Sequence, residues 1–169
     1  MYKKISFFSI IITCLIFSCH TVMAGDRFTD NGNGTVTDNK LGLMWAKADN
    51  QGDINWKQAN SWAKYTFGDT ISPRYDNWRL PTLEELKSLY VEDSKYKGYM
   101  TDCGFMVKIL PKIKLSCILL WTSEKSTGAH VAFNFAIGNS FAIPAYDVVG
   151  CRGLPVRSLK NDNFQPSKD

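Results

Sequence analysis

The sequence predicts a single α+β domain in which two helices pack against small antiparallel sheets. Its 169 residues, 44% of them hydrophobic, are enough to bury one core but too few for two comfortable domains. Two segments carry helix-start signals followed by apolar residues at helical spacing. Several short β-favouring runs are separated by turn-forming dipeptides. These three observations together indicate one compact unit with short strands.

The domain is expected to begin with a small β-meander. Residues 31–34 contain two Asn-Gly dipeptides, which accept the positive φ of tight turns, and residues 35–37 (Thr-Val-Thr) favour a strand. A second turn over residues 39–42 then leads into the apolar run 43–45. The residues expected on the buried side of this meander are Phe28, Val36, Leu43 and Trp45.

The same segment is rich in acidic and amide residues, so we compared it with a calcium loop of the EF-hand type. That loop needs a glycine at position 6 and a glutamate at position 12. Counting from Asp30 puts Leu41 at the twelfth position, and counting from Asn31 puts Val36 where the glycine belongs. The polar residues are therefore interpreted as turn formers and not as metal ligands.

Two helices are predicted from capping boxes, in which an Asn or Thr is followed three residues later by a Gln or Glu. The box at residues 55–58 opens a helix from Trp56 to about Phe67, with Gly68 ending it. The box at residues 82–85 opens the second helix. Its expected buried stripe is Leu83, Leu86, Leu89 and Tyr90.

The C-terminal half is expected to be a second set of strands. Residues 119–123 read as a buried strand, and residues 131–137 alternate large apolar with small or polar side chains, from Val131 to Ile137. After a turn at Gly138-Asn139, residues 141–143 can return antiparallel. Residues 154–159 are expected to close the fold against the N-terminal meander.

The first 24 residues have the pattern of a secretory signal peptide. Two lysines precede an apolar run over residues 5–17, and small residues follow, so we expect cleavage after Ala24. An alternative is lipoprotein processing at Cys19. No later run reaches the roughly 20 apolar residues of a spanning helix. We expect a domain over residues 25–159, a flexible tail over 160–169, and a periplasmic or secreted, cell-surface location.

The charge balance argues against a general nucleic-acid binder. The chain has 20 basic and 16 acidic residues, a net charge of +4, and removing Lys3 and Lys4 with the signal lowers it to +2. A nearly neutral domain lacks the overall basic character of such proteins, although local basic patches are still allowed.

Three cysteines remain after signal cleavage, in a compartment where disulfides form. Pairing Cys103 with Cys117 would close a loop of about 15 residues, worth about 3 kcal/mol in the chain-entropy model. The alternative is that both of these and Cys151 are unpaired, buried apolar residues. A zinc site is not indicated, because no two of them have zinc-ligand spacing and His130 is the one histidine after cleavage.

Five segments in a fixed order carry a resemblance to a known family. They are FTDNGNGTVTD at 28–38, LGLMW at 41–45, WRLPT at 78–82 followed by Glu85-Leu86, WTSE at 121–124 and LPVR at 154–157. The set resembles the Lcl C-terminal domain family, formerly a domain of unknown function and named for a bacterial collagen-like surface adhesin. The resemblance implies a C-type-lectin-like fold with two helices and small twisted antiparallel sheets, related to the formylglycine-generating and sulfatase-modifying group.

That resemblance also implies a function. Many members are secreted or surface-exposed in bacteria, and the naming adhesin is associated with sulfated glycosaminoglycans. This sequence departs from the naming adhesin in one respect, since no collagen-like repeat precedes the domain, and this departure counts against the adhesin role. What remains is a binding module for an anionic, sulfated glycan or for a protein of the envelope or cell surface.

The segment from Tyr90 to Cys117 is where we expect a partner to bind, since loops on a rigid scaffold commonly carry function. It is rich in lysine and aromatic residues, which suit screened charge contacts with a sulfated glycan. The alternative is a solvated lysine face over the apolar run 107–113. The predicted ligand-binding residues are Lys95, Lys97, Lys108, Lys112 and Lys114.

The other chemically capable residues are interpreted as structural. Arg79 and Arg157 are expected to bridge helix and sheet, with an anion clamp as the alternative. The five tryptophans lie on apolar faces of predicted elements and are expected mostly in the core. His130 is the sole side chain that titrates near neutral pH, and a lone histidine at a strand start is usually a surface or capping residue.

We therefore expect a binding protein and not an enzyme. The alternative is an enzyme, or an enzyme accessory, related to the sulfatase-modifying group. A third possibility is a structural partner within a larger surface assembly. The sequence implies no cofactor and gives no indication of the oligomeric state.

Overall fold

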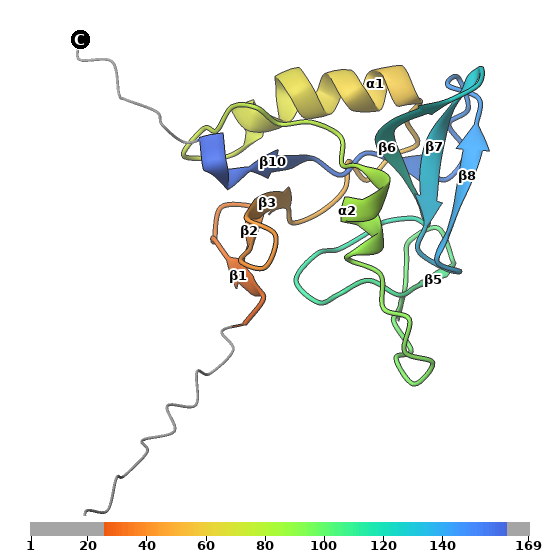
Figure 1. Cartoon of the computed structure of the whole chain (residues 1–169), viewed down its shortest axis with the longest axis horizontal. Helices are drawn as coiled ribbons and strands as arrows, with labels where there is room; N and C mark the ends of the chain where they lie inside the picture. The colour runs from red at the N-terminus through yellow and green to blue at the C-terminus, as the bar shows by residue number, and fades with distance from the viewer. Residues whose placement is uncertain (1–25, 162–169) are drawn as a thin grey trace, which may run out of the picture.

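The computed structural model describes residues 26–161, which form an α+β domain (Figure 1). Two α-helices and small, mainly antiparallel sheets confirm the predicted fold class. The elements are β1 (Phe28–Asp30), β2 (Thr35–Asp38), β3 (Leu43–Ala46), α1 (Trp56–Ser61), η1 (Trp62–Thr66), η2 (Phe67–Thr70), α2 (Leu83–Lys87), β4 (Tyr99–Met100), β5 (Met106–Val107), β6 (Leu119–Ser126), β7 (Ala129–Asn134), β8 (Asn139–Ile143), β9 (Cys151–Arg152), β10 (Val156–Ser158) and η3 (Leu159–Asn161). The predicted signal peptide and residues 162–169 of the predicted tail lie outside the described residues. Among residues 26–161, neither helix combines the length and apolar character that crossing a bilayer requires.

The predicted meander is present and forms most of the first sheet, whose order is β1-β2-β3-β10. Val36 and Val156 both lie opposite Trp45, one on each neighbouring strand. Gly32 and Gly34 have φ values of 74° and 84°, as the two Asn-Gly dipeptides predicted. The C-terminal strand β10 pairs antiparallel with β3, so it closes the fold against the N-terminal meander as expected.

The second sheet has the order β8-β7-β6-β9 and differs in one respect from the prediction. Strand β7 ends at Asn134, and Ile137 is 56% exposed. Ala132 is fully buried beside Phe133, so the two faces of β7 are both covered there. One face packs with the alanines of α1 and η1 and the other with the leucines of α2. The simple alternation expected for residues 131–137 was therefore wrong.

Helix α1 starts at its predicted capping box, where Asn55 accepts from the backbone of Gln58. The predicted single helix over residues 56–67 is instead three pieces: α1, the π-helical segment η1 and the 3-10 segment η2. Gly68 lies inside η2 and does not end the helix. A Cβ at Gly68 would lie 2.7 Å from the carbonyl oxygen of Tyr75, so this glycine allows a close backbone approach.

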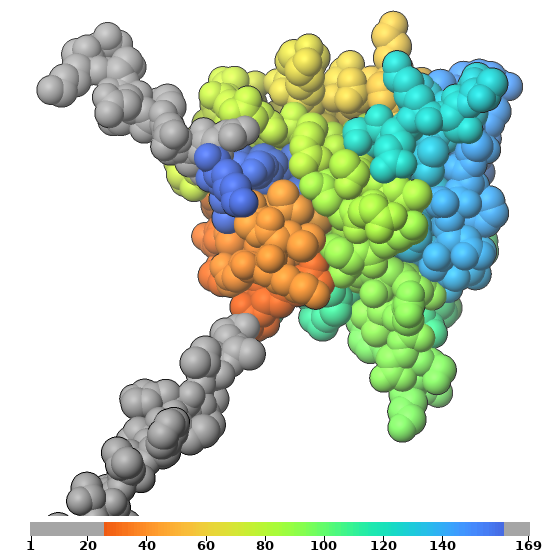
Figure 2. Space-filling model, viewed as in Figure 1, coloured from red at the N-terminus to blue at the C-terminus, as the bar shows by residue number. Residues whose placement is uncertain are grey.

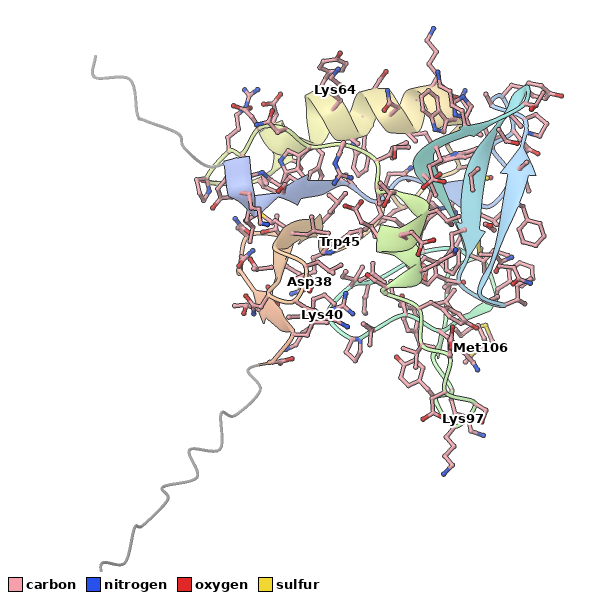
Figure 3. The ribbon with its side chains drawn as sticks, viewed as in Figure 1. Asp38, Lys40, Trp45, Lys64, Lys97 and Met106 are labelled. Carbon is pink, nitrogen blue, oxygen red and sulfur yellow. A yellow bond between two sulfur atoms is a disulfide. The ribbon has the colours of Figure 1, made fainter. Side chains whose placement is uncertain are left out.

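Helix α2 also starts at its predicted capping box, with Thr82 accepting from the backbone of Glu85. Leu86 and Leu89 are fully buried in the main core, where Figure 3 places Trp45 between the first sheet and α2. Leu83 and Tyr90 pack against the same core while partly exposed. The expected apolar stripe is therefore the surface that joins α2 to both sheets.

The predicted disulfide between Cys103 and Cys117 is present, with an S–S distance of 2.07 Å. It holds the turn of the β4–β5 hairpin to the segment that precedes β6. Cys151 is a free, buried cysteine in β9. The alternative of three unpaired cysteines is therefore wrong.

Candidate functional site

A groove of about 440 Å³ lies between the η1–η2 segment and the end of β3. Trp62, Phe67 and Ile71 give it an apolar wall. Two lysines, Lys47 and Lys114, line it as well. The remaining lining residues are Asn33, Gly34, Ala48, Asp49 and Thr70.

The two groove lysines are brought together by backbone pairing. The N–H of Lys114 donates to the carbonyl oxygen of Lys47 at 2.8 Å, and Asp49 N–H donates to the carbonyl of Lys114 at 3.3 Å. These two bonds form a short parallel β-bridge between Ala48 and Lys114. The bridge holds the segment that follows β3 alongside the segment that follows β5. Two cationic side chains far apart in the sequence thus share one site.

The acidic residues around the groove are already engaged. Asp49 is 5% exposed, and its carboxylate accepts from Ser116 N at 2.7 Å, Ser116 Oγ at 2.8 Å and Gln51 N at 2.9 Å. Asp30 pairs with Lys47, and this hydrogen bond lowers the pKa of Asp30. Within residues 26–161 the ion pairs do not include Lys114. The positive charge of Lys114 therefore faces the groove without a carboxylate in ion-pair contact.

Trp62 contributes to the groove wall from the π-helical segment η1, a conformation that is rare in proteins and frequent at functional sites. The N–H of Phe67 donates to the carbonyl of Trp62, closing the wide turn. Trp62 is half-buried and lies between the groove and a second hollow, because it lines both. No sequence signal distinguished this turn from an ordinary α-helical one.

The family model of the Lcl C-terminal domain matches residues 34–152, well over half of the chain. This chain belongs to the Lcl C-terminal domain family. The matched range contains every residue that lines the groove except Asn33. No curated protein matches the chain. The expected relation to C-type-lectin-like and sulfatase-modifying folds stays a prediction.

In this Lcl C-terminal domain the five lysines predicted as ligand-binding do not form one patch. Lys95 and Lys97 lie in the segment between α2 and β4, which projects from the body (Figure 2), and Lys97 points away at its far end (Figure 3). Lys108 is half-buried after β5, with its backbone paired to that of Val91 and Phe135. Lys112 is exposed two residues before Lys114, and it is one of the charges that lower the pKa of Asp30.

Of those five lysines, only Lys114 lines the groove. Lys47, the other lysine that lines the groove, was not predicted, because the prediction considered only lysines in the segment from Tyr90 to Cys117. The backbone pairing between the two segments is a tertiary feature with no local signal.

His130 packs against an aromatic ring and not against an acid or a thiol. Its ring stacks on Trp56 with centroids 3.7 Å apart and planes at 16°. Nδ1 is buried and has no hydrogen-bond partner within the described residues. Burial lowers the pKa of His130, and Lys125 adds to the effect. Across residues 26–161, no three His, Cys, Asp or Glu side chains are grouped to hold a metal ion.

The two family-motif arginines hold parts of the fold together. The guanidinium of Arg79 donates to both carboxylate oxygens of Glu85, at 2.8 and 2.7 Å. Arg157 is 2% exposed, donates to the carbonyl of Asp76 at 3.0 Å and lies 4.9 Å from the ring centre of Tyr75. These contacts support the structural interpretation of both residues.

Proposed function

We propose that this Lcl C-terminal domain is a binding module that recognises an anionic glycan in the groove beside η1. The observation that carries the proposal is that Lys114, together with Lys47 in its ion pair with Asp30, lines a groove whose apolar wall includes Trp62. A sulfated or carboxylated sugar has an apolar ring face and a negative substituent, and this groove offers a partner for each.

The two kinds of contact give the proposed complex a defined response to salt. The lysine contacts are exposed to solvent, so added salt screens them over a Debye length of about 8–10 Å. Packing of the ring face on Trp62 is far less sensitive to salt. Affinity should therefore fall steeply with ionic strength and then level off at a weak residual value.

We favour binding over catalysis, with an enzyme or accessory of the sulfatase-modifying group as the alternative. The two side chains best suited to catalysis, His130 and Cys151, lie in environments that oppose it. His130 is stacked on Trp56, and burial raises the pKa of the Cys151 thiol to about 12, which opposes formation of the reactive thiolate.

The proposal includes export of the domain, by signal cleavage after Ala24 or by lipidation at Cys19. Arg27 supports cleavage at this position, because it already contacts two other segments of the fold. Its guanidinium binds the Asp38 carboxylate and donates to the carbonyl of Ser88 at 2.8 Å. A protein of the envelope or cell surface is the alternative ligand.

Retention on a heparin matrix tests the proposed site. Lys114→Ala should elute at clearly lower salt than the unmodified domain. Lys97→Ala is the matched control, since it removes the same charge from the projecting segment, and it should elute near the unmodified position. A shift for Lys97→Ala that equals or exceeds that of Lys114→Ala would overturn the proposal, as would an unmoved Lys114→Ala.

A further inference from the structure

We infer that the groove continues past Trp62 into a second subsite that takes an uncharged sugar ring, so that the ligand is a chain of several sugars and not a single anionic group. This inference rests on the function proposed above and adds the length and the charge pattern of the ligand. The subsite lies on the exposed side of α1 and η1.

The groove shares lining residues with two further hollows. The second hollow, of about 530 Å³, shares Trp62 with the groove, and a third, of about 220 Å³, shares Ala48, Asp49 and Lys114 with it. The two larger hollows each lie in the size range of pockets that hold ligands of many atoms. One sulfated sugar in the groove would leave the space on the other side of Trp62 unfilled.

The second hollow is chemically different from the groove. It contains no lysine or arginine, and its lining residues are Asp53, Ile54, Gln58, Ser61, Trp62, Tyr65 and Thr66. Asp53 is the one charged residue in this lining, and its carboxylate forms an ion pair with Arg152, which lowers the pKa of Asp53. A sulfate would find no lysine or arginine among these lining residues, whereas sugar hydroxyls could bond to the amide and hydroxyl side chains.

Tyr65 gives this hollow its surface for stacking. It is 66% exposed, and Lys64 Nζ lies 5.2 Å from its ring centre. Lys64 itself projects outward from the helix (Figure 3), so it covers at most one face of the ring. The exposed face of such a ring suits the apolar face of a sugar.

The π-helical turn is a second observation that points to the same place. It contains both Trp62 and Tyr65, the two aromatic residues of the second hollow. Such turns are usually retained where function needs them, because they disrupt the regular helix.

Calorimetry with heparin-derived oligosaccharides of two, four and eight sugar units tests this inference. Tyr65→Ala should weaken binding of the longer chains about threefold to tenfold and leave the disaccharide unchanged. Tyr146→Ala is the matched control, because Tyr146 is 82% exposed and lines none of the three hollows. Octasaccharides with sulfates confined to one half should bind at least as tightly as evenly sulfated ones carrying the same number of sulfates.

The outcomes separate the inference from the proposed function. If the oligosaccharides bind and Lys114→Ala weakens them, but Tyr65→Ala has no effect at any length, the second subsite alone is refuted. A preference for even sulfation refutes the uncharged character of the subsite. If none of the oligosaccharides binds, or if Lys114→Ala leaves their affinity unchanged, both the proposed function and the second subsite are refuted.

Discussion

Replacing Arg27 with alanine should destabilise the domain by about 3 kcal/mol, because it leaves a buried carboxylate without its counterion. Asp38 is fully buried, and Arg27 binds both of its oxygens, at 3.0 and 2.6 Å. The same guanidinium donates to the carbonyl and hydroxyl oxygens of Ser88, at 2.8 and 3.1 Å, so it ties β2 to the end of α2.

The size of the loss follows from what Asp38 retains. Breaking a buried ion pair from one side typically costs about 3–5 kcal/mol. Asp38 would keep two backbone donors, the N–H groups of Lys40 and Leu41 at 3.1 and 3.2 Å. The Arg27 side chain is also 20% exposed, so water can enter the vacated space. Both features place the expected value at the lower end of the range.

Urea unfolding measures this loss as a shift of the midpoint at constant slope. Arg74→Ala is the control, since Arg74 is 65% exposed and pairs with two exposed aspartates. Its effect should stay within about 0.5 kcal/mol. Adding Asp38→Asn to Arg27→Ala should recover part of the stability by removing the unpaired charge. An Arg27→Ala effect as small as that of the control would refute the reasoning.

Three further predictions concern stability. Cys103→Ser with Cys117→Ser should cost about 3 kcal/mol in urea unfolding, the value for a loop of about 15 residues, and an unchanged midpoint would contradict this. Gly68→Ala should cost about 1–3 kcal/mol because its Cβ would meet a backbone oxygen, whereas Gly52→Ala, whose Cβ would make only ordinary van der Waals contacts, should cost less. Because the folded-state pKa of His130 is lowered, the unfolded chain binds the proton more readily, so stability should decrease as pH falls through about 6.5. His130→Gln should show a smaller loss between pH 7.5 and 5, and an identical loss would count against the burial effect.

Local chemistry in the sequence was enough to predict the elements that start and turn at specific residues. The two capping boxes and the Asn-Gly turns depend on neighbouring side chains and backbone groups, so they can be read along the chain. The Cys103–Cys117 pair was accessible for the same reason, since it closes a short loop. These features predicted where the two helices begin, where the first strands turn and which cysteines pair.

The site could not be predicted from local sequence in this way, because it depends on contacts between distant segments. Lys114 was among the predicted ligand-binding residues but Lys47 was not, and the two come together through backbone pairing between distant segments. The π-helical turn follows α1 with no glycine or proline to mark a change of helix type. Ala132 was expected on the open face of its strand, but helix α1 covers that face. In each case tertiary packing decided the outcome.

The location of the ligand is the central claim, and an amide chemical-shift titration with a heparin tetrasaccharide tests it most directly. The account predicts that the shifts gather on residues 47–49, on Lys114 and on the amide and indole N–H groups of Trp62. Shifts confined to the segment around Lys95 and Lys97, with the Trp62 indole unmoved, would contradict it.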